Sequence, residues 1–359
     1  MKIGISTGGG DCPGLNACLR AVVKHAIGTY GMEVVGISDS FNGLMNRPID
    51  VKPVVLDDVT HMLSRGGTFL GTTNQGNPFK FLGPNDTQPC DKSQMVLEGY
   101  KKTGLDGIVV VGGDGTQSIA HQLIKLGLNI VGVPKTIDND LAGTDETIGF
   151  QTAVEIAADA ISRLQTTAES HDRIMVLEVM GRDAGHIALH AGIAGGANII
   201  LLPEIPFSYD AIVRKIEERK KRGRYFSIVV VSEGAFEVGA SPQMQTVTTS
   251  AHQPKNLGGI GAVVAQVLHD KTGIDSRVTV LGHVQRGGSP CHYDRVLASG
   301  FGIHAVELIK QKKFGRVVVK QKGRYTDIPY ADVAGKARPL SLDSEYIKTA
   351  EALGISLGR

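Results

Sequence analysis

The sequence has no long apolar run, no excess of charge of one sign, and few cysteines. A helix that spans a bilayer needs roughly 18 or more consecutive apolar residues, so we expect no membrane association. The 38 Lys and Arg residues are balanced by 36 Asp and Glu residues, for a formal net charge of +2 at pH 7. A strongly cationic nucleic-acid-binding protein would usually show a basic excess or basic clusters. We therefore expect no nucleic-acid partner.

The four cysteines, Cys12, Cys18, Cys90 and Cys291, lack the spacing of metal ligands. Scattered thiols of this kind are typical of reduced cytosolic proteins. Residues 2–6 already have the apolar pattern of a strand, which leaves no room for the charged and apolar regions of a signal peptide. We therefore expect a cytoplasmic protein.

The sequence is rich in glycine and long for a single core. It has 359 residues, of which 46 are glycine, with 42% hydrophobic and 21% charged residues. This composition is that of a globular protein, and the length favours two domains. The glycines cluster where apolar runs end, which is where a chain without Cβ atoms passes close to a ligand or turns sharply.

Short apolar runs alternate with amphipathic stretches, which predicts an α/β fold with parallel sheets covered on both faces. The expected strands read as continuous Val and Ile runs, as buried parallel strands should. They are residues 3–7, 34–38, 107–111, 130–134, 174–179, 198–202, 227–231, 278–283 and 317–319. The expected helices are residues 15–27, 118–126, 150–166, 209–222, 260–272 and 293–312. Residues 83–93 and 239–255 have no periodicity and are expected to be surface loops.

Polar and glycine-rich clusters follow three of these strands in the first half of the chain. Residues 6–16 (STGGGDCPGLN) and 111–116 (VGGDGT) each stand between a strand and a helix, where backbone N–H groups form an anion site. Residues 134–140 (PKTIDND) place two carboxylates two positions apart. Phosphoryl transfer needs such a division of labour, with one carboxylate to accept the proton of the attacking hydroxyl and another to help place a metal ion.

Two further clusters follow strands in the second half of the chain. They are residues 178–186 (EVMGRDAGH) and 277–290 (RVTVLGHVQRGGSP). Arginine presents a planar fork that matches a phosphate, and these arginines stand beside glycines at strand ends. We therefore expect phosphate contacts from this half of the chain, with His283 functional and His186 structural.

In this order and spacing, the five clusters resemble the phosphofructokinase family, from about residue 2 to residue 308. The resemblance implies two similar-sized, doubly wound domains with mainly parallel sheets and an active site in the cleft between them. Residues 1–149 with about 285–335 would bind nucleotide and Mg²⁺, and residues 150–284 with about 336–359 would bind the sugar phosphate. The implied reaction is ATP-dependent phosphorylation of fructose 6-phosphate in glycolysis.

The resemblance also implies roles for individual residues. Asp138 matches the general base, with Lys135, Thr136 and Arg182 as further catalytic residues. Asp114 and Asp140 lie in the environment of Mg²⁺. Residues that match the ATP site are Gly10, Phe41, Asn74, Gly112, Gly113, Gly115 and Thr116. Residues that match the sugar-phosphate site are Thr136, Asp138, Asp140, Arg173, Met180, Gly181, Arg182, Glu233, Arg277, His283 and Arg286.

The resemblance further implies an oligomer, usually a tetramer, because Arg173 and Arg277 match arginines that reach the 6-phosphate from a neighbouring subunit. Basic residues also match an effector pocket for an anionic regulator. They are Arg20, Lys24, Arg222 and Arg224.

Three positions bear on the identity of the phosphoryl donor, and they do not all favour the same donor. Gly115 leaves room for the α-phosphate of a nucleotide, whereas pyrophosphate-dependent relatives commonly carry an aspartate there. Lys135 is the residue that those relatives use, and Asn74 stands where the family usually has an arginine that touches the donor. We expect ATP, with pyrophosphate or ADP as the alternative. A kinase of NAD or of lipids, or a non-catalytic regulatory relative, fits the acidic and arginine clusters less well.

Overall fold

The computed structural model describes residues 1–83, 87–240 and 259–359. The two expected surface loops, residues 83–93 and 239–255, lie partly outside the described residues. Within the described residues the chain forms two compact units, each made from two stretches of sequence. Unit 1 comprises Met1–Thr152 and Arg286–Ala337, and unit 2 comprises Ala153–Gln285 and Arg338–Arg359. Each unit has its own sheet and its own core.

Unit 1 contains a seven-stranded sheet in the order β11-β10-β5-β4-β1-β2-β3. The five inner strands pair in parallel, and the two edge strands β3 and β11 run antiparallel to their neighbours. The strands are β1 (Lys2–Gly8), β2 (Glu33–Ile37), β3 (Val51–Pro53), β4 (Gly107–Gly112), β5 (Ile130–Pro134), β10 (Arg316–Gln321) and β11 (Arg324–Pro329).

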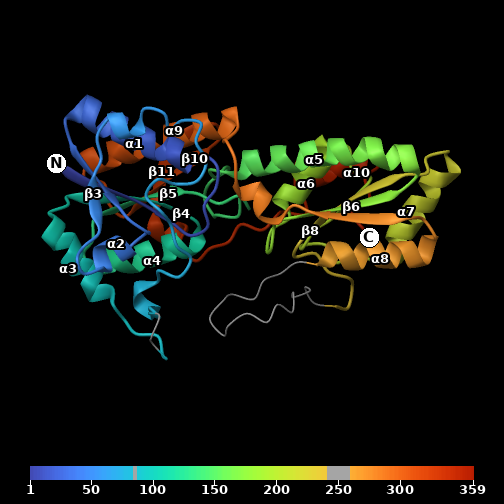
Figure 1. Cartoon of the computed structure of the whole chain (residues 1–359), viewed down its shortest axis with the longest axis horizontal. Coiled ribbons are helices and arrows are strands. Elements are labelled where there is room, and N and C mark those ends of the chain that lie inside the picture. The colour runs from blue at the N-terminus through green and yellow to red at the C-terminus, as the bar shows by residue number, and fades with distance from the viewer. Residues whose placement is uncertain (84–86, 241–258) are drawn as a thin grey trace. The chain divides into compact units, whose positions relative to one another are not determined.

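Helices cover both faces of this sheet (Figure 1). One face carries α1 (Leu15–Tyr30) and α9 (His292–Lys310), and the other carries α2 (Asn42–Met45), α3 (Ser93–Thr103) and α4 (Asp114–Lys125). Short 3₁₀ helices lie at η1 (Asp57–Val59), η2 (Pro78–Lys80) and η4 (Tyr330–Asp332). The central strands are buried on both sides, so their Val and Ile side chains form the core of unit 1.

Unit 2 contains a four-stranded parallel sheet in the order β7-β8-β6-β9. Its strands are β6 (Ile174–Val179), β7 (Ile199–Leu201), β8 (Ser227–Ser232) and β9 (Ser276–Val280). Figure 1 shows α5 (Phe150–His171), α6 (His186–Ala194) and α10 (Glu345–Ala352) on one face, and α7 (Tyr209–Lys221) and α8 (Ile260–Thr272) on the other. The predicted α/β fold class with mainly parallel sheets is confirmed.

Several boundaries differ from the predictions. Helix α4 begins at Asp114 rather than at residue 118, so the GDGT motif forms its first turn. The strand expected at 278–283 ends at Val280, because Gly282 has a φ of 47° and a 3₁₀ helix, η3 (Gly282–Arg286), follows. Strand β9 is a partly exposed edge, with Val280 52% exposed, rather than a buried strand. Among the described helices and strands, β3, β11, α2, α3, α6 and α10 were not predicted from the sequence.

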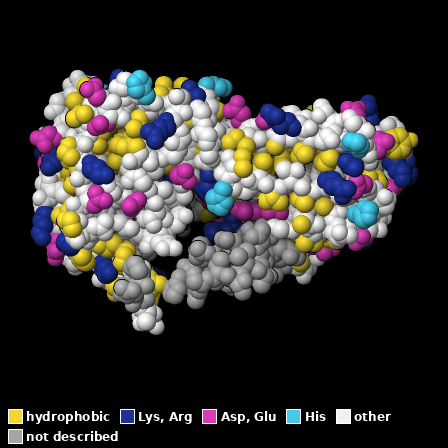
Figure 2. Space-filling view, viewed as in Figure 1, with side chains coloured by type: hydrophobic (Ala, Val, Ile, Leu, Met, Phe, Trp, Pro, Cys, Tyr) yellow, Lys and Arg dark blue, Asp and Glu magenta, His cyan; other side chains and the backbone are white. Residues whose placement is uncertain are grey.

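The described surface carries interspersed charges. In the view of Figure 2, Lys and Arg side chains lie among Asp and Glu side chains on both units, in keeping with the balanced composition. No helix in the described ranges is long and apolar enough to cross a bilayer.

Candidate active site

Three of the predicted clusters meet at one edge of the sheet of unit 1. Strands β1, β4 and β5 are neighbours, and Gly8 pairs with Gly112, which in turn pairs with Pro134. The turns that follow these strands therefore lie side by side at the carboxyl ends of parallel strands. This is the edge where ligands bind in open α/β sheets.

Glycine is required at two of these strand ends because the side chain of Thr116 packs across them. A Cβ atom on Gly8 would lie 2.7 Å from Thr116, and one on Gly112 would lie 2.4 Å from it. Asp114 and Gly115 form the first turn of α4 immediately beyond. The N–H groups and the dipole at this helix start suit a phosphate.

The segment around Asn74 is tied to the first glycine-rich turn. The N–H of Gly9, whose φ is 78°, donates to the carbonyl of Thr73 over 3.1 Å, and the hydroxyl of Thr72 donates to the carbonyl of Gly9 over 2.6 Å. A Cβ atom on Gly9 would lie 4.0 Å from Oδ1 of Asn74. The structure therefore brings Asn74, an exposed side chain, to the predicted donor site.

Lys135 and Arg286 both contact the same glycine-rich turn. The Lys135 side chain is only 3% exposed, and its ammonium donates to the carbonyl of Gly10. Burial lowers the pKa of Lys135. Nη1 of Arg286 lies 3.4 Å from the carbonyl oxygen of Asp11 and would be 2.8 Å from a Cβ on Gly10. Arg286, which the resemblance puts at the sugar phosphate, thus lies against the glycine-rich turn of unit 1.

The segment after β5 holds the predicted base in a defined turn. The N–H of Asp138 donates to the hydroxyl of Thr136 over 3.1 Å. Asn139, the next residue, is left-handed with a φ of 54°. Asp138 and Asp140 are half-buried. Neighbouring carboxylates in such a turn have the oxygen chemistry needed for proton transfer and for a hard metal ion.

The predicted metal carboxylates fit Mg²⁺ in chemistry, although they do not form a complete cage. Asp114 is exposed, and its Oδ1 accepts from the N–H of Gly335 over 2.9 Å. Among the described residues there is no group of three or more His, Cys, Asp and Glu side chains arranged for a metal. Mg²⁺ usually takes only one or two protein carboxylates and completes its shell with waters and substrate phosphates.

In unit 2, the predicted sugar-phosphate residues follow the central strand β6. Gly181 has a φ of 129°, and the side chain of Ser232 donates to its carbonyl over 2.6 Å. A Cβ atom on Gly234 would collide with the carbonyl of Arg182, so the turns after β6 and β8 touch through their backbones. The exposed Arg182 side chain is paired with Asp183 at 2.7 Å. Glu233 follows β8 and is half-buried.

Gln285 joins the β6 turn to η3 and was not predicted as a site residue. Its side chain is wholly buried, and Oε1 accepts from the N–H of Met180 over 2.7 Å. Its Nε2 donates to the carbonyl of Ala153 over 3.4 Å. The amide therefore fixes Met180 relative to η3, the short helix that carries the exposed His283.

Arg173 and Arg277 lie together, although 104 positions separate them. The register of β6 and β9 pairs Met175 with Arg277. Both arginines bind one carboxylate, that of Asp275, at 2.7 Å and 2.9 Å. The Arg277 side chain is 60% exposed. The two arginines thus share one carboxylate in unit 2.

Other predicted residues do not join these groups. Phe41 is 0% exposed and packs in the core of unit 1, so burial does not support the expected contact with adenine, and we leave it out of the nucleotide site. Arg20 and Lys24 lie on α1 in unit 1. Arg222 and Arg224 follow α7 in unit 2 and are exposed.

Comparison with known proteins identifies the family. The sequence profile of the phosphofructokinase family matches residues 2–309, so the chain belongs to this family of phosphotransferases. The chain is 47% identical to ATP-dependent 6-phosphofructokinase 1 of Synechocystis sp., over 99% of this chain and 98% of that protein.

Two further similarities concern the donor and the fold. The chain is 49% identical to pyrophosphate–fructose 6-phosphate 1-phosphotransferase of Amycolatopsis methanolica, over 91% of this chain and 92% of that protein. Its structure resembles the phosphofructokinase of Pichia pastoris, with a TM-score of 0.81 and 31% identity over 99% of this chain. This chain spans 37% of that longer one. Relatives that use different donors are thus about equally similar in sequence, and the donor has to be inferred from individual residues.

Proposed function

We propose that this protein is an ATP-dependent 6-phosphofructokinase, which transfers the γ-phosphoryl group of ATP to the 1-hydroxyl of fructose 6-phosphate in glycolysis. The observation that carries the proposal is the convergence of two glycine-rich turns and the Asp138 turn at one sheet edge. The similarity to relatives named as ATP-dependent 6-phosphofructokinases supports it.

Unit 1 is assigned to the nucleotide. Gly10 comes from the first glycine-rich turn, and Asn74 comes from the segment bonded to that turn. Gly112 ends β4, and the remaining residues lie at the start of α4, whose N–H groups favour phosphate oxygens. The proposed nucleotide residues are Gly10, Asn74, Gly112, Gly113, Gly115 and Thr116.

Asp138 is assigned as the general base that takes the proton from the 1-hydroxyl as the oxygen attacks. Thr136 orients Asp138 through the 3.1 Å hydrogen bond from its backbone N–H. The buried ammonium of Lys135, held at the carbonyl of Gly10, adds positive charge beside the phosphate turn. Positioned bases of this kind typically contribute about 10²–10⁴-fold to the rate.

Asp114 and Asp140 are assigned to hold Mg²⁺ together with the phosphates of the nucleotide. When bound, Mg²⁺ neutralises phosphate charge and orients the transferring group.

Unit 2 is assigned to the sugar phosphate, through Met180, Gly181, Arg182, Glu233 and His283, with Arg286 contributed by the start of the second stretch of unit 1. Arg182 would stabilise the transferring group. Arg173 and Arg277, already paired on one carboxylate, would bind the 6-phosphate of a substrate held by a neighbouring subunit. This assignment makes the working protein an oligomer, for which we propose a homotetramer. An anionic regulator at Arg20, Lys24, Arg222 and Arg224, and a cytoplasmic location, stay predictions.

The donor is best tested directly. Purified protein is supplied with fructose 6-phosphate and Mg²⁺, and with ATP, ADP or pyrophosphate in parallel, and fructose 1,6-bisphosphate is measured. We expect turnover with ATP and little with pyrophosphate, because Gly115 leaves the α-phosphate site open. Turnover with pyrophosphate alone, as the name of the Amycolatopsis relative describes, would mean that Lys135 outweighs Gly115.

A further inference from the structure

The turn that carries Asp138 is part of a loop whose two ends are joined. Residues 136–147 leave the end of β5 and return beside it, because Lys135 forms a parallel bridge with Ile148. The N–H of Ile148 donates to the carbonyl of Pro134 over 3.2 Å. We call residues 136–147 the base loop. Its position relative to β5 decides where the carboxylate of Asp138 lies.

Inside the base loop, one hydroxyl ties the returning arm to the residues on either side of Asp138. The Thr147 hydroxyl lies 2.7 Å from the carbonyl oxygen of Thr136 and 3.2 Å from Oδ1 of Asn139. Nδ2 of Asn139 donates to the carbonyl of Asp145 over 3.3 Å. A left-handed residue other than glycine is strained and persists only where its surroundings hold it. The returning arm therefore holds Asn139, and through it Asp138.

Strand β10 and the turn after it hold the returning arm from outside. The N–H of Asp145 donates to the carbonyl of Lys320 over 2.8 Å, and the N–H of Lys320 donates to the hydroxyl of Thr144 over 3.1 Å. The N–H of Lys322 donates to the carboxylate of Asp145 over 2.7 Å. Lys320 and Lys322 contribute only backbone groups to these contacts, so the contacts depend little on which side chain stands at position 320.

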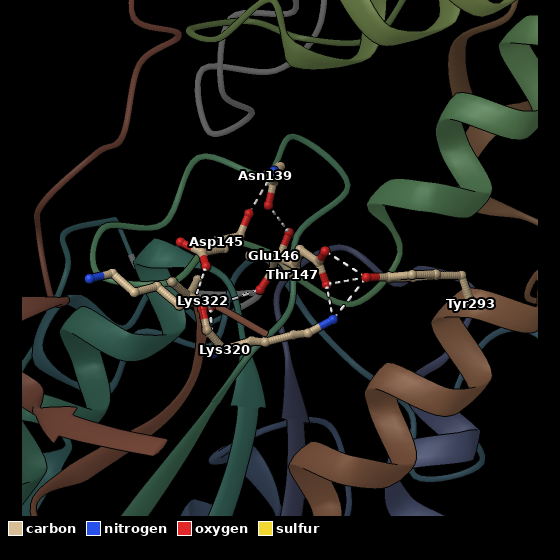
Figure 3. A network of polar contacts seen from close by, with 8 residues as sticks. Asn139, Asp145, Glu146, Thr147, Tyr293, Lys320 and Lys322 are labelled. Carbon is tan, nitrogen blue, oxygen red and sulfur yellow. Dashed lines mark hydrogen bonds and ion pairs between the residues drawn. The ribbon is translucent and has the colours of Figure 1, made fainter. Parts of the chain in front are cut away.

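Three side chains add a closed set of contacts at Glu146, the residue before Thr147 (Figure 3). The ammonium of Lys320 donates to Oε2 of Glu146 and to the hydroxyl of Tyr293, each over 2.8 Å. The Tyr293 hydroxyl donates to the same carboxylate, at 2.6 Å and 2.8 Å from its two oxygens. The Lys320 and Glu146 side chains are only 18% and 23% exposed. Burial alone would lower the pKa of Lys320, but the hydrogen bonds to Glu146 and Tyr293 raise it.

We propose that Lys320, Tyr293 and Glu146 form a positioning triad that fixes the base loop and thereby the carboxylate of Asp138. The triad comes from three separate parts of unit 1, namely β10, the first turn of α9 and the loop itself. It acts through Thr147, which joins the neighbours of Asp138 directly. The three residues touch no reacting atom in this account, so they are positioning residues. The inference rests on the proposed role of Asp138 as the base.

A second ion pair on the same hairpin supplies a matched control. Arg316, at the other end of β10, binds Asp327 on β11 at 2.5 Å, and the two side chains are 34% and 19% exposed. This pair resembles the Lys320–Glu146 pair in burial and in length, but its two side chains contact each other and His304 rather than the base loop. Its loss should therefore affect only the stability of the hairpin.

The first test compares Lys320→Met with Arg316→Met in steady-state kinetics. Moving a catalytic group by about 1 Å lowers the rate by up to roughly 10²-fold. We therefore expect Lys320→Met, which would let the carboxylate of Asp138 shift, to lower kcat by about 10-fold or more. KM for fructose 6-phosphate should stay within about 2-fold, because the residues of unit 2 proposed to bind the sugar phosphate lie outside the base loop. Arg316→Met should keep both constants near those of the unchanged protein. Lys320→Met with an unchanged kcat would overturn the proposal.

The second test asks whether Lys320 acts through Asp138. Residues that work as one unit are not additive, so adding Lys320→Met to Asp138→Asn should lower the residual rate little further. The same fold-loss in both backgrounds would assign Lys320 a general structural role instead.

Hydrogen exchange gives a readout that does not need activity. Amides of residues 136–147 should exchange faster in Lys320→Met and not in Arg316→Met. Equal exchange in the two variants would contradict the triad even if the protein proved to have another activity. Conversely, absence of phosphofructokinase activity in the unchanged protein would refute the proposed function and leave this comparison valid.

Discussion

Replacing Gly115 with aspartate tests the assignment of the donor site most sharply. Gly115 lies in the first turn of α4, and a Cβ atom built on it meets nothing within 4 Å. An acidic side chain near a helix N-terminus stabilises the helix by about 0.3–1 kcal/mol, and a glycine within a helix costs up to about 1 kcal/mol relative to alanine. Gly115→Asp should therefore fold as well as the unchanged protein.

The effect on ATP use follows from charge. A carboxylate held about 4 Å from a phosphate costs about 4 kcal/mol at the effective dielectric constant of roughly 20 that applies near a protein surface. Since about 1.4 kcal/mol corresponds to tenfold, kcat/KM for ATP should fall by roughly 10³-fold. KM for fructose 6-phosphate should change little, because its proposed contacts lie elsewhere.

Two control variants separate charge from bulk. Gly115→Ala adds only the Cβ atom, for which there is room, and should retain most of the activity with ATP. Gly115→Asn has nearly the volume of aspartate without its charge. Initial rates with ATP and with pyrophosphate, together with Tm, would be measured for all three variants. Undiminished use of ATP by a folded Gly115→Asp protein would refute the reasoning, since the α-phosphate could not then lie near position 115.

Further predictions concern the base, the arginine pair and the buried histidine. Asp138→Asn should lower kcat by about 10²–10⁴-fold with fructose 6-phosphate binding retained in equilibrium titrations; a near-normal kcat would end the assignment. Arg277→Ala should raise KM for fructose 6-phosphate about 10- to 100-fold, as the loss of a charged hydrogen bond does, with a much smaller change in kcat. Replacing Arg173 with alanine should have the same effect on KM. Mixed oligomers of Asp138→Asn and Arg277→Ala subunits should regain activity if active sites are shared between subunits, and no recovery would place both residues in the site of one chain. Burial lowers the pKa of His186 to about 4, below its ordinary value near 6.5. The unfolded chain therefore gains a proton there between about pH 6.5 and 4 while the folded protein does not, so acidification across this window should cost up to about 3 kcal/mol of stability. In urea titrations from pH 7 to 4.5, His186→Gln should lose less stability on acidification than the unchanged protein, and equal losses would contradict the assignment.

The sheet edge of the candidate site was predictable because its pattern is local. Each glycine-rich or acidic cluster follows a continuous apolar run, and parallel strands bring their carboxyl ends to one edge. The pattern was less informative where a glycine changed the backbone. Gly282 ends β9 early, so His283 and Arg286 lie on a 3₁₀ helix. In unit 1, the GDGT motif continues into α4 rather than ending before it.

The contacts that position the site could not be predicted, because they join residues far apart in sequence. Glu146 and Lys320 are 174 positions apart, and each alone has the appearance of a solvated surface charge. The pairing of Arg173 and Arg277 on one carboxylate depends on the register of β6 and β9. The orientation of Phe41 could not be predicted either, because the sequence around a lone aromatic residue at a loop edge does not reveal whether its side chain faces a ligand or the core.

The central claim, that this protein phosphorylates fructose 6-phosphate from ATP, is tested most directly by identifying the products. ³¹P NMR of a reaction with fructose 6-phosphate, ATP and Mg²⁺ should show ADP and a new phosphoryl group on the 1-hydroxyl, with fructose 1,6-bisphosphate accumulating only while ATP is consumed. The account would be contradicted if no bisphosphate formed with ATP while pyrophosphate, in an otherwise identical reaction, yielded it.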